Sequence, residues 1–194
     1  MNVKKCQAFG WFFTGKGFEM ATVQITLELL PERYALEKEK KCKEKRENVM
    51  IREMKEADAN QVARIWLDSN REAHDFIPAE YWEENYQAVK EALLQGEVYV
   101  CEMEMAGKTD IVGFIGLNED FIEGIFVRDN VRSRGVGREL LDYVKDRRNQ
   151  LMLGVYQKNL RAIRFYQREE FLVRQEGVDG NTGEKEYTML WRRQ

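Results

Sequence analysis

The sequence predicts a mixed α/β (α+β) domain, because segments with the two-residue period of strands alternate with segments that have the longer period of amphipathic helices. A strand pattern opens at Met50 and is followed by helical patterns. Three strand-like segments then come in succession, with turn residues Gly107 and Asn118 between them. A turn rich in glycine and arginine finally leads into a strongly amphipathic helix. A length of 194 residues suits one such domain with an extension.

The expected elements follow in chain order. A strand at 50–54 precedes a helix that Asp58 can cap, and a second helix runs over 79–94, after the loop Ala73–Pro78. The three successive strands form a meander at 98–103, 111–117 and 121–127. The amphipathic helix after the turn carries Val136, Leu140, Leu141 and Val144 on one face. The remaining elements are a strand at 151–156, a helix at 160–168, and strands near 171–175 and 186–191.

The first 49 residues differ in composition from the rest. Residues 9–18 are aromatic and rich in glycine, 23–30 fit a strand, and 36–47 are almost all charged, which is typical of a solvated helix or linker. Ten basic and seven acidic residues give this segment a formal charge of +3, against −6 for the remainder. We therefore predict an N-terminal extension at 1–49, either an appendage or a mis-assigned start, and a domain at 50–194 that folds by itself.

Composition excludes several classes of protein. A net charge of −3 gives no general attraction to nucleic acid or anionic lipid, although the basic run Lys38–Arg46 keeps nucleic-acid binding as an alternative reading. Cys6, Cys42 and Cys101 lie far apart and form no zinc-binding pattern, as expected in a reducing cytosol. No segment approaches the roughly 20 apolar residues of a membrane span. We expect a cytoplasmic protein, monomeric or homodimeric, with no metal, membrane or nucleic-acid partner.

The segment Val131–Leu141 is the most informative, because it combines the features of an anion-binding turn. Gly135 and Gly137 let the backbone approach a diphosphate, and a helix starting near Val136 presents unpaired N–H groups to it. The side chains of Arg132, Arg134 and Arg138 add mobile positive charge. A third glycine near Leu140 or a Gly-Lys-Ser/Thr sequence would be needed for the two common nucleotide-binding loops, and neither is present. A glycine-rich turn with surface arginines is the alternative.

This turn resembles the R-x-x-G-x-G motif of the GNAT acetyltransferase superfamily, and a second motif supports the likeness. Residues 153–166 resemble the family's strand followed by an N-x-x-A-x-x-F-Y helix, here Asn159 to Tyr166, in the expected order and spacing. The resemblance covers about residues 50–194. The loop A-H-D-F-I at 73–77, with Tyr81 and Trp82 after it, resembles small bacterial members of the family, some of which acetylate protein lysines. Two departures stand out, since the family often has glycine at the positions of Ser133 and Glu170.

The resemblance implies a fold and a cosubstrate. The sheet would contain about seven strands flanked by about four helices, with the fourth and fifth strands, 121–127 and 151–156, parallel and splayed apart. The cosubstrate would be acetyl-CoA, and its pantetheine arm would pair with backbone groups in the splay. The residues that would bind acetyl-CoA are Ile125, Phe126, Val127, Arg132, Ser133, Arg134, Gly135, Val136, Gly137, Arg138, Asn159 and Phe165.

Acetyl transfer to an amine requires a neutral amine and a proton for the departing thiolate. Asn159 and Tyr166 are seven residues apart, roughly 10 Å along a helix, so they share a face. By resemblance Tyr166 is the general acid, with packing beside Phe165 as the alternative, and Asn159 binds pantetheine or caps the helix. Period two places Glu123 on the same face as Phe121, Ile125 and Val127.

Many family members carry a catalytic glutamate near the position of Phe121, which is aromatic here. Glu123 can relay a proton through water or be an ordinary solvated carboxylate, whereas Phe121 is expected to shape the acceptor tunnel. The only histidine, His74, lies in the loop that covers the acceptor site in the family, with Phe76 and Tyr81 as further expected substrate contacts. For His74, acceptor binding and loop packing are both open. Nearby acidic residues favour a cationic amine, or form a solvated helix face.

The predicted function is therefore transfer of the acetyl group of acetyl-CoA to a primary amine, either on a protein (lysine or N-terminus) or on a small molecule. The missing carboxylate at Phe121 motivates a second hypothesis, a CoA-binding regulatory module without turnover.

Overall fold

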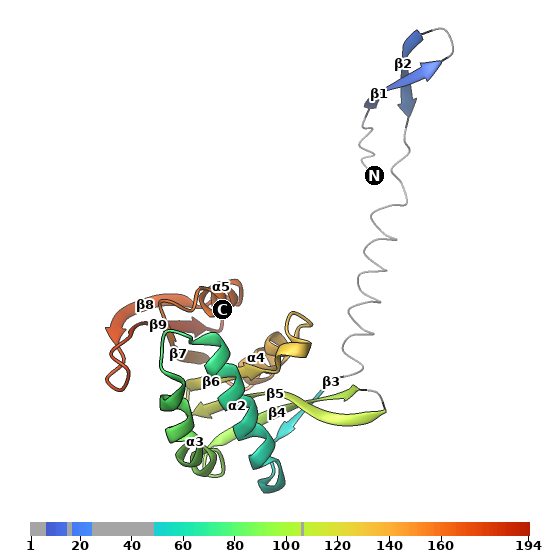
Figure 1. Cartoon of the computed structure of the whole chain (residues 1–194). Coiled ribbons are helices and arrows are strands. Elements are labelled where there is room, and N and C mark those ends of the chain that lie inside the picture. Colours follow the sequence, from blue (N-terminus) through green and yellow to red (C-terminus); the bar gives the residue numbers. More distant parts are fainter. Residues whose placement is uncertain (1–6, 15–16, 25–48, 106) are drawn as a thin grey trace. The chain divides into compact units, whose positions relative to one another are not determined.

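The computed structural model describes residues 7–14, 17–24, 49–105 and 107–194 (Figure 1). The chain divides into two units, Met1–Glu47 and Asn48–Gln194. In the first, β1 (Gln7–Thr14) and β2 (Gly17–Gln24) form an antiparallel hairpin with Gln7 opposite Gln24 and Thr14 opposite Gly17. The sequence predicted no strand at β1 and placed one at 23–30, which lies mostly outside the described residues.

The second unit contains a seven-stranded mixed sheet, as predicted. Its strands lie in the order β3-β4-β5-β6-β7-β9-β8. All neighbouring pairs are antiparallel except β6 and β7, which are parallel. The strands are β3 (Val49–Glu53), β4 (Glu97–Met105), β5 (Lys108–Asn118), β6 (Phe121–Val127), β7 (Gln150–Tyr156), β8 (Leu172–Val178) and β9 (Lys185–Arg192).

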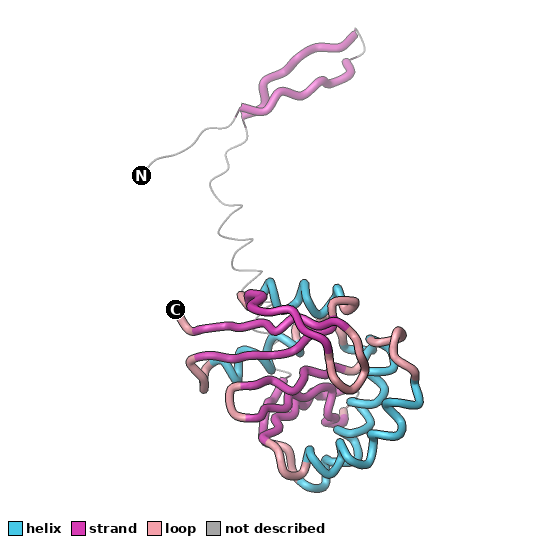
Figure 2. The backbone as a smooth tube through the Cα atoms, turned by 90° about the vertical axis from the view of Figure 1, so that its left-hand side faces the viewer, coloured by secondary structure: helices cyan, strands magenta, loops and turns pink. Residues whose placement is uncertain are grey.

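The four predicted helices are also present, and Figure 2 shows them flanking the strands of the sheet. They are α2 (Ala59–Ala73), α3 (Ala79–Leu93), α4 (Val136–Lys145) and α5 (Leu160–Arg168), with short 3-10 turns at Glu56–Asp58 and Asp129–Val131. Within the described residues, no helix has the length and apolar character needed to cross a membrane. Asp58 stands at the start of α2, but its carboxylate binds Arg52 and the Lys55 N–H rather than a backbone group of the helix.

Two apolar cores lie on opposite faces of the sheet. On one face, Val62 and Ile65 of α2 pack with Leu93 of α3 against Val100 and Phe114 of the sheet. On the other, the predicted apolar stripe of α4 packs against β7 and against Ile163 and Tyr166 of α5. Helices α2 and α3 therefore cover one face, and α4 and α5 the other.

The prediction that Phe121, Glu123, Ile125 and Val127 share one face is wrong, because Phe121 and Glu123 lie on the α2 face and Ile125 and Val127 on the α4 face. The register between β5 and β6 shifts between Gly116, which faces Gly124, and Leu117, which faces Ile122. Glu123 is therefore the additional residue of a β-bulge, which breaks the two-residue alternation. As a result Ile122 and Ile125, three residues apart, both pack in the core beneath α4. Phe121 instead lies beside Gly154 of β7, and Glu123 is exposed.

Strands β6 and β7 pair only where they begin, which confirms the predicted splay. Phe121 faces Met152 and Ile122 faces Leu153, and beyond these two pairs the strands separate. The backbone of Asp120 accepts a further hydrogen bond of 2.8 Å from the Met152 N–H at this closed end. The gap between β6 and β7 opens toward the turn that precedes α4.

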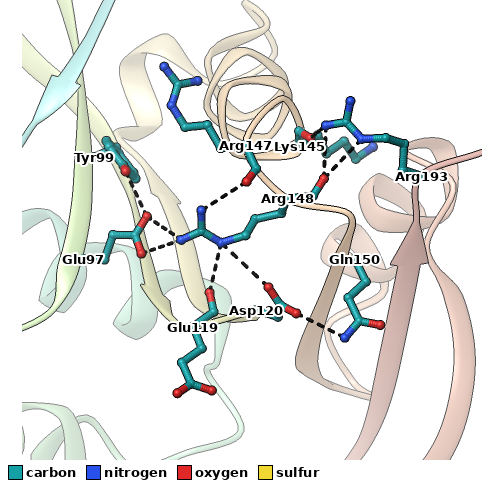
Figure 3. Close-up of polar contacts among 9 residues, drawn as sticks. All are labelled: Glu97, Tyr99, Glu119, Asp120, Lys145, Arg147, Arg148, Gln150 and Arg193. Carbon is teal, nitrogen blue, oxygen red and sulfur yellow. Dashed lines mark hydrogen bonds and ion pairs between the residues drawn. The ribbon is translucent and has the colours of Figure 1, made fainter.

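A polar network holds the closed end of the splay (Figure 3). Arg148, which follows α4, donates two hydrogen bonds of 2.6 and 2.8 Å to the Glu97 carboxylate and lies 3.8 Å from Asp120. Gln150, the first residue of β7, also donates to Asp120, at 3.1 Å. Arg193 reaches the carbonyl of Arg148, so this network joins the start of β4, the β5–β6 turn, α4, β7 and the end of β9.

Candidate active site

The turn before α4 has the backbone geometry of an anion cradle. Gly135 has φ +96° and a Cβ atom at this position would meet nothing within 4 Å, so the space beside it is open. Ser133 also has a positive φ of 62°. The N–H groups of Val136 and Gly137, the first of α4, make no hydrogen bond with any described residue. A diphosphate fits these groups, because unpaired N–H donors at a helix start attract anions.

The three arginines of this turn differ in their surroundings. Arg132 is not a mobile charge as predicted, because its side chain bonds Glu72 of α2, Asp129 and the Val127 carbonyl. It therefore fixes the turn to α2 and to the end of β6. Arg134 is exposed and without a partner in the described chain, whereas Arg138 lies 3.6 Å from Asp142 at the surface. Arg138 also lies 3.9 Å from Glu169, so of the three arginines Arg134 alone has no ion pair with the part of the chain that the structure describes.

The edge of β6 that does not pair with β5 presents backbone groups to the gap between β6 and β7. Arg128 donates its N–H to the Val112 carbonyl of β5. Since the backbone groups of a strand alternate between its two edges, Val127 and Ile125 present theirs to the gap, whereas Phe126 faces β5. The Val127 carbonyl already accepts a bond from Arg132, which leaves the Val127 N–H and the Ile125 N–H and carbonyl. The Phe126 ring stacks on Phe114, 4.9 Å between centroids, on the α2 face.

Tyr166 is buried in the core beneath α4, on the side of the sheet opposite α2. Its ring lies 5.2 Å from that of Phe165 and 5.6 Å from that of Phe171, so it packs as well as carrying a hydroxyl group. Burial raises the pKa of the Tyr166 phenol, which keeps the group protonated at neutral pH. The ring of Phe165 lies 3.6 Å from where a Cβ atom on Gly137 would stand. Helix α5 thus packs directly on the start of the cradle helix.

Asn159 is the N-cap of α5, and it also binds His74. Its Oδ1 accepts a hydrogen bond of 3.0 Å from the Ala162 N–H, and its Nδ2 lies 3.1 Å from His74 Nε2. The cap orients the amide, so Nδ2 is the donor and His74 Nε2 must be the acceptor. His74 Nδ1 in turn donates to Asn70 Oδ1 at 3.0 Å. The His74 ring is therefore neutral, and burial lowers its pKa to about 4, although Asp75 opposes the shift.

An aromatic cluster surrounds His74 on the α2 and α3 side of the sheet. The His74 ring lies 5.1 Å from that of Tyr156, 5.5 Å from that of Trp82 and 5.6 Å from that of Phe76. Tyr81 completes the aromatic cluster, 5.0 Å from Trp82. The Trp82 Nε1 donor is buried and lacks a hydrogen-bond partner among the described residues. Three residues predicted to contact substrate, His74, Phe76 and Tyr81, therefore come together.

Phe121 lies farther along the same face of the sheet. Asp179 and Glu186, two carboxylates outside both sequence motifs, also lie on this face. Tyr156 donates a hydrogen bond to Asp179, which also accepts from Thr182 at 2.9 Å. Burial alone would raise the pKa of Asp179, but its hydrogen bonds from Tyr156, Asn181 and Thr182 lower it overall. The carboxylate of Glu186 on β9 lies over Gly154, beside Phe121. Neither Asp179 nor Glu186 was predicted as a site residue, because both lie outside the two sequence motifs.

Known proteins resemble this chain in sequence and in fold. Residues 59–171 match the Acetyltransferase (GNAT) family. The peptidyl-lysine N-acetyltransferase YiaC of Escherichia coli is 37% identical over 126 residues, which span 64% of this chain and 84% of YiaC. The peptidyl-lysine N-acetyltransferase YjaB of the same organism is 29% identical over 125 residues, 64% of this chain and 83% of YjaB.

Solved structures extend the likeness to the fold. The solution structure of apo YjaB from E. coli has a TM-score of 0.64 and 26% identity, and covers 73% of this chain and 96% of YjaB. The N-acetyltransferase PaiA of Thermoplasma acidophilum, solved with coenzyme A, has a TM-score of 0.61 at 17% identity, over 75% of this chain and 99% of PaiA. The fold is shared with these proteins, and the family match spans more than half of the sequence. This chain therefore belongs to the acetyltransferase (GNAT) family.

Proposed function

We propose that this chain acetylates lysine side chains of proteins by direct attack of the amine on acetyl-CoA. Transfer of an acetyl group from acetyl-CoA to an amine follows from membership of the family, and the choice of lysine is the proposal. The observation that carries it is the arrangement around the splay. The cradle and Tyr166 lie on the α4 side, whereas the aromatic cluster, Asp179 and Glu186 lie on the α2 side. Donor and acceptor can thus meet in the gap between β6 and β7.

The acceptor side suits a lysine for two reasons. Aromatic faces attract a cation and also pack against its aliphatic stem. The carboxylates of Asp179 and Glu186 add a negative potential that attracts an ammonium group. YiaC and YjaB, the relatives in sequence, are named as acting on peptidyl lysine, which supports the same acceptor here.

The donor side assigns roles to residues of the chain. Acetyl-CoA supplies an activated acetyl thioester. Val136 and Gly137 N–H groups hold its diphosphate, with Arg134 and Arg138 as additional cations, and Ile125 pairs with the pantetheine amides in the manner of an added strand. Tyr166 donates its phenolic proton to the departing sulfur. The Oδ1 atom of Asn159 caps α5 and its Nδ2 atom donates to His74, so both polar atoms of the amide already have partners. Asn159 therefore positions helix α5 rather than binding pantetheine.

The test is a panel of acceptors with release of free CoA thiol as the readout. One peptide carries a free lysine and a blocked N-terminus, and its matched control carries an acetylated lysine and a free N-terminus. A linear polyamine is the third acceptor. We expect thiol release and a mass gain of one acetyl group for the lysine peptide alone. Turnover of the polyamine only would contradict the lysine assignment. Tight binding of acetyl-CoA without turnover of any amine would favour the CoA-binding regulatory module.

We also propose that residues 50–194 form the N-acetyltransferase domain and that residues 1–49 are dispensable for acetyl transfer. All residues assigned above lie in the unit Asn48–Gln194. A variant that begins at Met50 should bind acetyl-CoA and turn over the lysine peptide like the full chain. Salt-dependent nucleic-acid binding that disappears with the same deletion would instead support a separate role for the basic run Lys38–Arg46.

A further inference from the structure

Glu186 places a carboxylate at the point where β6 and β7 separate. A Cβ atom built on Gly154 would lie 3.1 Å from Glu186 Oε2 and 4.0 Å from Phe121 Cζ, so carboxylate and ring meet above this glycine. Gly154 is the first residue of β7 beyond the two pairs that join it to β6. Glu186 faces Tyr156 across β7 and β9, and so lies on the side of the aromatic cluster. The absent side chain of Gly154 is what leaves room for this carboxylate.

Glu186 differs from the neighbouring acids in having no partner. Asp179 is bonded to Tyr156 and Thr182, and Glu184 forms an ion pair of 2.7 Å with Lys158. Glu186 is half-buried and forms no hydrogen bond or ion pair through its side chain with any residue that the structure describes. A partly buried carboxylate without a cation is costly unless a ligand supplies one.

The reaction lacks a proton acceptor at the position where the family often has one. Phe121 carries no titratable group, and Glu123 occupies the bulge with its side chain exposed. We propose that Glu186 binds the acceptor ammonium group and takes its proton, and so replaces the missing carboxylate from a different strand. This assignment rests on the proposed acetyl transfer to an amine, which it deepens by naming the base.

Acetyl transfer with Glu186 as base and Tyr166 as acid releases one proton overall. The ammonium nitrogen loses one proton to Glu186, and the resulting neutral amine forms the N–C bond with the acetyl carbon. The C–S bond breaks, and the sulfur takes the proton of Tyr166. The nitrogen then loses its second proton, which passes through water to the Tyr166 phenolate. Glu186 releases the first proton to solvent. The products are the acetylated amine, the free thiol and one proton.

The surroundings of Glu186 make it a stronger base than an exposed carboxylate. Titratable groups on its side of the sheet include Asp179 of the β8–β9 turn, Tyr156 of β7, Tyr81 of α3 and the neutral His74. The cation Lys158 also lies on this side, 5.0 Å from the Phe76 ring, and is paired with Glu184. Burial, and then the charge of Asp179, raise the pKa of Glu186. A carboxylate with a raised pKa is a stronger base than an ordinary one.

The experiment compares Glu186→Gln with Glu176→Gln in the full-length protein. Both changes remove one carboxylate from the β8–β9 pair, but Glu176 is exposed on β8. Each variant is assayed with the lysine peptide and with an aminooxy analogue, whose nitrogen is already neutral at pH 7. We expect Glu186→Gln to lower kcat/KM for lysine by about 100-fold or more, the usual contribution of a general base, and to lower it much less for the analogue. Glu176→Gln should match wild type with both acceptors.

Three results would overturn the assignment. Wild-type rates in Glu186→Gln, or equal losses with both acceptors, would remove Glu186 as the base while leaving acetyl transfer itself established. Absence of turnover in the wild-type protein would instead refute the proposed function, and the Glu186 assignment with it. Acetyl-CoA affinity and melting temperature report whether the variant is folded. If Glu186→Gln does not fold, Glu186→Asp provides the same comparison. A smaller loss of kcat/KM for lysine than for the analogue in Glu186→Asp would then contradict the proposal.

Discussion

His74 Nε2 accepts a hydrogen bond from Asn159 Nδ2 at 3.1 Å, so the loop after α2 is joined directly to the N-cap residue of α5. The connection continues from His74 Nδ1 to Asn70 and from Asn70 Nδ2 to the Trp66 carbonyl. Asn159 meanwhile caps α5, the helix that carries Tyr166. The aromatic cluster and the helix that carries the expected general acid are therefore held in one hydrogen-bonded chain.

The neutral state of His74 gives a prediction for the pH dependence of stability. The pKa of His74 is about 4 in the folded chain and 6.5 ordinarily, so the unfolded state binds more protons between these values. The stability that this group contributes is complete above pH 6.5 and is lost as the pH falls toward 4. Because His74 is the only histidine, its imidazole NMR signals report the titration directly.

Asn159→Asp tests the same hydrogen bond. An aspartate keeps the cap on Ala162 N–H but cannot donate to His74, and its charge favours the imidazolium form. We expect the His74 pKa to rise well above 4 in this variant. Asn149→Asp, an exposed change next to Arg148, should leave it unchanged. An unaltered titration in Asn159→Asp would show that this hydrogen bond does not set the protonation state.

Tyr166→Phe removes the phenolic proton and keeps the packing of the ring. We expect turnover to fall by about 100-fold or more, as for loss of a general acid, while acetyl-CoA affinity stays nearly constant. Steady-state kinetics and calorimetric binding measure the two quantities. Tyr143→Phe removes a hydroxyl from α4, where the ring lies against Tyr99 and Arg147, and should change neither. Equal turnover in Tyr166→Phe and wild type would leave Tyr166 as a packing residue.

The cradle is tested by two glycines with the same backbone conformation. Gly135 and Gly107 have φ values of +96° and +76°, and a Cβ atom on either would meet nothing within 4 Å. Substitution by alanine costs each about 1 kcal/mol of strain. We expect only Gly135→Ala to weaken acetyl-CoA binding, because Gly107 lies in the β4–β5 turn. Gly137→Val should weaken binding further, since its branches would crowd Phe165 and Val127. Equal affinity in all three variants would contradict the cradle.

The two departures from the family's glycines coincide with strained backbone. Ser133 and Glu170 have φ values of +62° and +67°, a region in which glycine is unstrained. We expect Ser133→Gly and Glu170→Gly each to stabilise the chain by about 1 kcal/mol, measured by chemical denaturation. Ser133→Ala and Glu170→Ala keep the Cβ atom and should give no gain. A loss of stability in both glycine variants would show that these side chains compensate for the strain.

Local patterns predicted the fold well but not how distant segments meet. The α4 stripe and the strand patterns predicted the individual elements, because these depend on residues close in sequence. The seven-stranded sheet, its splay and the role of Tyr166 were implied by the family resemblance that the two motifs carry. The bulge at Glu123 could not be foreseen, because the sequence of β6 alone does not show which of its residues lacks a partner on β5. For the same reason the face of Phe121 was predicted incorrectly.

Side-chain pairing between distant segments was equally hidden. Arg132 was expected to be mobile, but Glu72, 60 residues earlier, holds it in place. Glu186 was not singled out because only the pairing of β7 with β9 brings it to Gly154. A carboxylate in a strand of alternating polar and apolar residues is interpreted as solvent-exposed unless the neighbouring strand is known.

The Arg148 network lies at one end of β6, whereas the cradle follows its other end. The interactions that fasten the closed end of the splay are thus separate from the cradle that would bind the donor. Changes in the cradle can then alter donor binding without loosening the strands at the closed end.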